Sequence, residues 1–275
     1  MAKAKTTAIT RPLHSVSPED REIIRCACAH LEHPSLAARL TNVVGTPMEI
    51  ALKLLPGDWY QRLHRGLERA IEKSLDVAVS EFHLVPGMQT GKHYYRAMCA
   101  GAGAVGGFFG LPGLLVELPV TTTLMLSAIA DIANAQGEDL QTVEGRMACL
   151  EVFALGGRSE LDDAADTGYY GLRFMVALSV SSAARHIQAH GLRKQGAPML
   201  VDLITLISSR FGIAVSEKAA AQLVPLIGAA TGALVNIIFI HHFQEMARHH
   251  FAIRRLERKY SPELVKSLYD EFNIG

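Results

Sequence analysis

An excess of charge of one sign, paired cysteines and strand-like alternation are all missing from this chain of 275 residues. Its 27 basic and 27 acidic residues give a formal net charge of +0, so the overall charge does not indicate a nucleic-acid partner. The four cysteines lack the paired spacing of a zinc site, and Cys26 and Cys28 are too close on a helix for a disulfide. We therefore expect reduced thiols and a cytoplasmic protein.

The N-terminal residues lack the continuous apolar stretch of a secretory signal. We expect residues 1–15 to form a flexible tail and residues 16–275 to form a single helical domain. Because apolar residues recur with the helical period and no sustained strand pattern occurs, the predicted fold class is mainly α, a single multi-helix, bundle-like domain.

Capping and breaking residues predict several helix boundaries. Ser17 and Pro18 suit a helix start, and a helical region over 48–83 is interrupted at 55–58. The remaining signals are a turn and cap at Gly137 to Asp139, a helix led by Asp162 and Asp163 and ending near His190, and a long final apolar helix capped by Ser216.

The most informative segment is apolar and rich in glycine. Residues 99–116 carry no charge and include six glycines. Glycine is unfavourable in a water-exposed helix, so these residues imply close helix contact or insertion in lipid. The small-residue spacing of Gly106 and Gly110, repeated at Gly228 and Gly232, predicts a tightly packed central helical hairpin.

The run from Gly101 to Gly106 also matches the dinucleotide-binding fingerprint. That motif requires a preceding buried strand and a surrounding βαβ unit, and the sequence predicts neither. We therefore predict no dinucleotide cofactor.

Several acidic residues lie within apolar surroundings and need a polar or charged partner if they are buried. Glu117 and Asp131 are fourteen residues apart and Glu144 and Glu151 are seven apart, spacings that share one face of an uninterrupted helix, although Pro119 interrupts the first interval. The predicted ligand or packing site comprises Gly106, Gly110, Glu117, Asp131, Glu144 and Glu151.

A second apolar block covers residues 219–240 without a charge. It is long enough to span a bilayer, but its polar residues also suit a buried hairpin helix. A basic stretch follows it, which fits either contact with anionic headgroups or a solvated helix face. The predicted membrane-surface contacts are Arg248, Arg254, Arg255, Arg258 and Lys259.

One helical stripe near the C-terminus carries His242, Glu245 and His249. Together with Glu117 and Asp131 these side chains form an alternative prediction, a divalent metal site in the core of a helical bundle. The competing interpretation is that arginine–carboxylate and histidine–backbone pairs hold the helices together. Apart from this metal ion, no cofactor is predicted.

An ordered set of motifs resembles the EcsC protein family. The set consists of the glycine-rich block from Gly101 to Leu126, Ile129-Ala-Asp-Ile-Ala, Gly137-Glu-Asp and the segment from Cys149 to Gly157. The resemblance extends over roughly residues 50–260 and implies one helical domain. It implies no catalytic residue, and the family takes its name from a member encoded beside an ABC transport system.

Three functions remain open from the sequence. The first is a non-enzymatic, membrane-associated protein on the cytoplasmic face, which binds a lipid or apolar ligand between its glycine-rich helices and acts beside a membrane transport system. Its partner would be the membrane surface or a membrane protein. The second is a metal-dependent hydrolase that uses the buried carboxylates and histidines. The third is a soluble protein-interaction domain.

Overall fold

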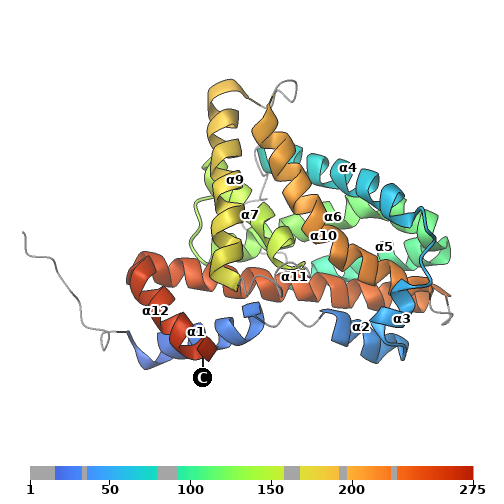
Figure 1. Ribbon diagram of the computed structural model, residues 1–275, viewed down its shortest axis with the longest axis horizontal. Coiled ribbons are helices and arrows are strands. Elements are labelled where there is room, and N and C mark those ends of the chain that lie inside the picture. Colours follow the sequence, from blue (N-terminus) through green and yellow to red (C-terminus); the bar gives the residue numbers. More distant parts are fainter. Residues whose placement is uncertain are drawn as a thin grey trace, which may run out of the picture.

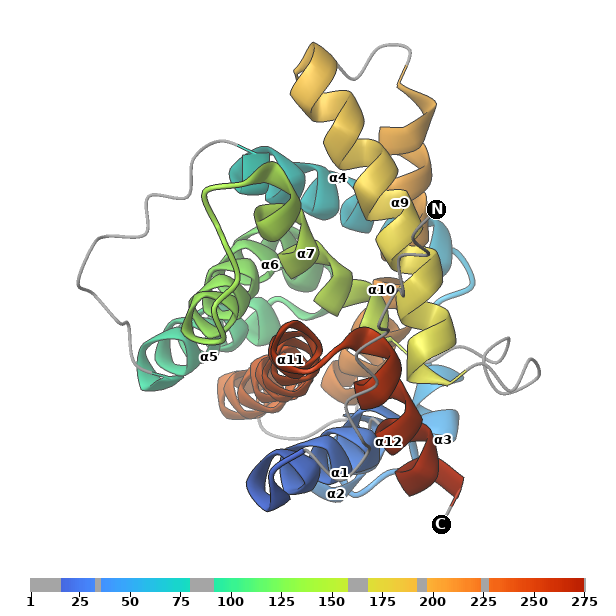
Figure 2. The same cartoon turned by 90° about the vertical axis from the view of Figure 1, so that its left-hand side faces the viewer.

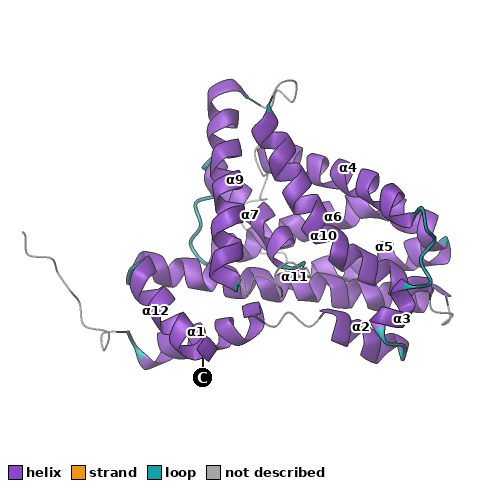
Figure 3. Cartoon of the chain, in the orientation of Figure 1, coloured by secondary structure: helices purple, strands orange, loops and turns teal. Residues whose placement is uncertain are grey.

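The computed structural model describes residues 16–32, 36–79, 92–157, 168–191, 197–223 and 228–274, and all its regular elements in these ranges are helices (Figure 3). The predicted mainly α fold is confirmed. The helices are α1 (Pro18–Glu32), α2 (Leu36–Val44), α3 (Met48–Leu52), α4 (Trp59–Val79), α5 (Lys92–Phe108), α6 (Gly110–Ala135), α7 (Val143–Leu155), α9 (Tyr169–His190), α10 (Pro198–Leu223), α11 (Gly228–Lys259) and α12 (Pro262–Ile274).

Local sequence signals explain several of these boundaries. The hydroxyl of Ser17 accepts a hydrogen bond from the Asp20 amide at 3.2 Å at the start of α1. The hydroxyl of Thr142 accepts one from Gly145 at the start of α7. The expected interruption separates α3 from α4. The predicted tail 1–15 and the helix start at Asp162 lie outside the described residues.

The long helix α11 crosses the middle of the molecule (Figure 1). It packs most extensively against α5 and also contacts α1, α6, α7, α10 and α12. A cluster of four tilted or edge-on phenylalanines joins α7, α10 and α11 in the core. Its members are Phe153, Phe211, Phe239 and Phe243.

Helices α5 and α6 form the glycine-rich hairpin, which lies away from α9 in both views (Figures 1 and 2). The chain turns at Gly110, whose φ of +63° favours glycine. A Cβ atom at Gly113 would lie 2.4 Å from the backbone oxygen of Gly106. The predicted tight packing of the two helices is therefore present, although Gly113 rather than Gly110 makes the close approach to Gly106.

The described parts of the second apolar block belong to two helices. Helix α10 continues past Ser216 to Leu223, and α11 begins at Gly228. Ser216 is buried within α10, so its predicted capping role is wrong. The physical reason is that α10 already begins at Pro198, so Ser216 lies in the interior of a helix and not at its first turn.

Two described helices, α6 and α10, are long and apolar enough to cross a membrane on length and composition alone. In each of them, 56% of the most apolar window is buried within the protein. Buried core helices of soluble proteins share these properties, so this finding is weak evidence for a span.

Candidate functional site

A buried ion pair joins the glycine-rich hairpin to helix α10. Lys218 on α10 donates from Nζ to Oε1 of Glu117 on α6 at 2.8 Å. Asn236 on α11 donates from Nδ2 to the same carboxylate oxygen at 2.6 Å and to the backbone oxygen of Cys99 at 2.7 Å. Helices α10 and α11 thus meet the distant helix α6 at one carboxylate.

Burial dominates the electrostatics of this cluster. The Lys218 side chain is 0% exposed, and burial lowers its pKa while the charge of Glu117 opposes the shift. Its ammonium also lies 5.2 Å from the centre of the Phe239 ring. Burial raises the pKa of Cys99 to about 12, so this thiol stays protonated at neutral pH.

Two glycines of α5 provide the space that the cluster occupies. A Cβ atom at Gly106 would lie 2.1 Å from Oε2 of Glu117, and one at Gly103 would lie 2.4 Å from Nδ2 of Asn236. Any larger residue at these positions would displace the polar groups. The glycines therefore admit both a close helix contact and the buried carboxylate.

An apolar pocket of about 540 Å³ opens beside this carboxylate. It lies between α5 and α6, and Glu117 is the one charged residue among the described residues of its lining. The Oε2 atom of Glu117 is buried and has no hydrogen-bond partner in the part of the chain that the structure describes. The lining consists of Ala102, Gly106, Phe109, Pro112, Gly113, Val116, Glu117 and Val120.

The other predicted site acids lie elsewhere. Asp131 accepts a hydrogen bond from the hydroxyl of Tyr95 at 2.9 Å. Glu144 is exposed and accepts from Gln188 at 2.8 Å. Glu151 is buried, with its Oε2 3.5 Å from Nε2 of His250. Of the six residues predicted as one ligand or packing site, Gly106 and Glu117 are the pair that the structure joins directly.

The predicted five-residue metal site is not assembled. Glu117 and Asp131 are fourteen positions apart on the continuous helix α6, which separates their backbones by about 21 Å at about 1.5 Å per residue. His242 instead contacts the backbone oxygen of Gly156 through Nε2 at 2.9 Å. A shared helix face does not bring residues together when several turns separate them.

Glu245 and His249 do lie together, with a third side chain that the sequence analysis did not identify. One ligand atom each from His30, Glu245 and His249 falls within 4.8 Å of the others. Burial, reinforced by His30, lowers the pKa of His249 to about 4. The guanidinium of Arg248 also contacts Glu245 and neutralises its charge.

Most of the predicted membrane-surface residues form ion pairs within the protein. Arg254 donates twice to Glu138 at 2.9 Å, and Arg258 contacts the same carboxylate. Lys259 donates to Asp20 at 2.7 Å, and Arg248 contacts Glu245 as described. Arg255 is exposed. Three of the five side chains therefore attach the C-terminal part of α11 to α1 and to the turn before α7.

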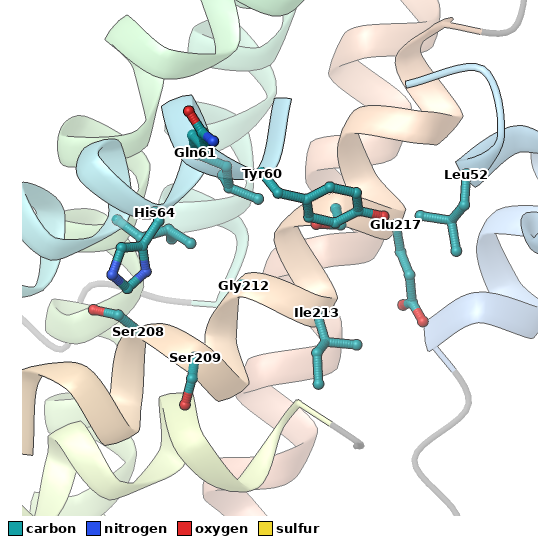
Figure 4. A pocket seen from close by; sticks show the side chains of 12 residues that line it. Leu52, Tyr60, Gln61, His64, Ser208, Ser209, Gly212, Ile213 and Glu217 are labelled. Atoms are coloured by element: carbon teal, nitrogen blue, oxygen red, sulfur yellow. The ribbon is translucent and has the colours of Figure 1, made fainter. Parts of the chain in front are cut away.

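A second cavity, of about 550 Å³, lies between α4 and α10 (Figure 4). Glu217 stands at one end, and His64 and Ser208 stand at the other, with Tyr60 between them. Burial, with a contribution from Glu49, raises the pKa of Glu217 to about 7. The hairpin pocket differs from this cavity in having a buried ion pair at its base.

Glu117 and Gly106 were predicted from the sequence as site residues, whereas Lys218 and Asn236 were not. Lys218 is the last charge before the uncharged block 219–240, and Asn236 is one of the few polar residues within that block. Polar residues at such positions signal a buried partner. They do not reveal which carboxylate is that partner.

The fold and the site define an all-helical domain in which a glycine-rich hairpin covers a buried ion pair and an apolar pocket. The chain belongs to the EcsC protein family, which matches residues 84–256. This range contains Glu117, Lys218 and Asn236, whereas His30 lies outside it. The predicted family is confirmed. No match was found among curated proteins or among solved structures.

Proposed function

We propose that this protein is a non-enzymatic, peripheral membrane protein. Its α5–α6 hairpin docks on the cytoplasmic face of a bilayer and takes the apolar part of a lipid into the hairpin pocket. The observation that carries the proposal is the apolar rim of the pocket. Phe109, Val116 and Val120 line it, yet their side chains are 64%, 78% and 50% exposed.

Exposed apolar groups that gather around one pocket mark an interaction site more strongly than scattered ones do. Two of the rim residues, Phe109 and Val116, belong to residues 99–116, which carry no charge. Placing such a segment at the boundary of headgroups and acyl chains removes apolar surface from water without burying a charge. A membrane surface is therefore a better partner for the hairpin than a polar protein surface.

The packing of the long helices favours docking over spanning. In both α6 and α10, more than half of the most apolar window is already buried in the protein core. The hairpin tip can enter the bilayer boundary while the buried polar cluster stays inside the protein. The ion pairs of Arg254, Arg258 and Lys259 leave the apolar rim as the main contact.

The arrangement supports binding rather than hydrolysis. The Oε1 atom of Glu117 accepts from both Lys218 and Asn236, so the carboxylate is held as a fixed acceptor. The carboxylates and histidines that a bundle-core metal site requires are dispersed over several turns. A lipid-binding role uses the groups that the hairpin brings together.

Co-sedimentation with phospholipid vesicles tests the proposal. We expect Val116→Glu to abolish binding, because it places a charge in the hydrocarbon boundary. The matched control is Leu178→Glu, a residue that is 56% exposed. It belongs to α9, which lies away from the hairpin (Figure 2). This control should bind as the wild type does. Failure of the wild type to bind, or loss of binding in the control alone, would contradict hairpin docking.

A further inference from the structure

We propose that the hairpin pocket recognises a neutral lipid through a free hydroxyl group, which donates a hydrogen bond to Oε2 of Glu117. An acylglycerol with one unesterified hydroxyl represents this ligand class. The inference rests on the proposed lipid-binding function and names the chemical group that the site selects.

Two buried acceptor atoms in the cluster lack a hydrogen-bond donor among the described residues. Glu117 is 6% exposed, and its Oε2 atom has no hydrogen-bond partner among the described residues. Asn236 Oδ1, in the same buried cluster, is also an acceptor without a partner there. Buried polar atoms are normally paired, and an unpaired acceptor is unfavourable. Both atoms require a donor rather than an acceptor.

The charges of the cluster favour a neutral ligand. Lys218 already neutralises Glu117 from 2.8 Å, so the buried pair carries no net charge. A cationic ligand head at Oε2 would lie close to the Lys218 ammonium at low dielectric, and an anionic head would face the carboxylate. A hydroxyl group supplies the hydrogen bond without adding a charge. The pocket therefore favours a neutral head.

The size and lining of the pocket suit a small lipid. The pocket volume of about 540 Å³ lies within the range of small-molecule sites, roughly 300–1,000 Å³. Oε2 of Glu117 occupies the space that a side chain at Gly106 would fill, and both residues line the pocket. The apolar walls from Ala102, Val116 and Val120 can contact the acyl chains. A lipid head that donates a hydrogen bond matches the carboxylate of Glu117, and an apolar lipid tail matches the apolar walls.

Isothermal titration with a water-soluble short-chain lipid tests the inference without a membrane. The probes are dihexanoylglycerol and the same molecule with its free hydroxyl acetylated. Loss of one hydrogen bond that leaves a buried acceptor unpaired corresponds to at least about tenfold weaker binding. We expect that difference in favour of dihexanoylglycerol. Equal binding of the two lipids, or no binding of either, would overturn the inference.

Two variants assign the effect to Glu117. In Gly106→Ala the new Cβ would meet Oε2 at 2.1 Å, so we expect dihexanoylglycerol binding to fall about tenfold. In the control Gly101→Ala, on the same helix, the Cβ meets nothing within 4 Å, and binding should change by less than about twofold. Equal effects of the two variants would contradict the assignment. The comparison of the two lipids on the wild type remains decisive if Gly106→Ala does not fold.

Failure of this inference is distinguishable from failure of membrane docking. Vesicle binding that is abolished by Val116→Glu, together with equal affinity for the two lipids, would support docking and overturn hydroxyl recognition. Discrimination between the soluble lipids without vesicle binding would support the pocket chemistry and overturn docking.

Discussion

Removing the buried cation should destabilise the protein severely. In Lys218→Met the apolar stem of the side chain is largely preserved, but Glu117 loses the ammonium that lies 2.8 Å from Oε1. Asn236 remains as a donor to the same oxygen. The variant therefore isolates the effect of leaving one negative charge uncompensated in the core.

The expected magnitude follows from burial. Removing one partner of a buried ion pair costs about 3–5 kcal/mol of unfolding free energy. Domains are stable by about 5–15 kcal/mol in total, so this is a large fraction of the stability. The double variant Glu117→Gln with Lys218→Met removes the stranded charge, and we expect it to recover at least about 2 kcal/mol relative to Lys218→Met.

Urea unfolding provides the assay, because the single tryptophan, Trp59, is 2% exposed and reports its own exposure to water by fluorescence. The matched control is Lys266→Met, which removes an exposed pair between Lys266 and Asp270 at 2.6 Å. This control should change the unfolding free energy by less than about 0.5 kcal/mol. A cost below about 1 kcal/mol for Lys218→Met, or no recovery in the double variant, would refute a tightly coupled buried pair.

Three further outcomes are expected. Because burial raises the pKa of Glu217 from 4.5 to about 7, its contribution to stability decreases as the pH rises through that window. This contribution opposes that of the buried histidines His242 and His250, so Glu217→Gln should steepen the fall of the urea midpoint as the pH decreases from 6.5 to 4.5; an unchanged slope would contradict this. Burial lowers the pKa values of His242 and His250 from 6.5 to about 4, so the unfolded chain binds more protons than the folded protein between these pH values. The wild type should therefore lose stability as the pH falls from 6.5 to 4. His250→Gln should reduce that loss, and an equal slope in variant and wild type would contradict this prediction. Gly113→Ala places a Cβ 2.4 Å from the Gly106 oxygen and should lower the unfolding free energy by about 1–3 kcal/mol. The control in the same urea titration is Gly57→Ala, whose Cβ would meet nothing within 4 Å. Equal effects of the two variants would show that the hairpin packs loosely.

The hairpin could be predicted because its signals are local. The glycines of residues 99–116 and the apolar pattern on both sides are read directly from the chain, and they indicate close helix contact. The need of Glu117 for a partner follows from its apolar surroundings. The partners themselves could not be predicted, because Lys218 and Asn236 are 101 and 119 residues away and come from different helices.

The partners of the basic stretch could not be predicted from the sequence for a different reason. Glu138 was expected in a turn and cap, but it is buried and binds Arg254 and Arg258. A run of arginines looks the same in a sequence whether it faces lipid headgroups or acids of its own fold. The structure separates the five residues predicted as metal ligands, because helical periodicity gives the face of a residue and not its height along the helix.

The most direct test of the proposed function is the depth of the hairpin in a bilayer. An environment-sensitive fluorophore is attached at Val116→Cys in a Cys26→Ser background, since Cys28, Cys99 and Cys149 are buried. The reference places the same label at Leu178→Cys on α9. We predict that vesicles with quencher groups on their acyl chains quench the label at position 116 and leave the label at position 178 unchanged. Equal quenching at both positions, or none at position 116, would contradict docking through the glycine-rich hairpin.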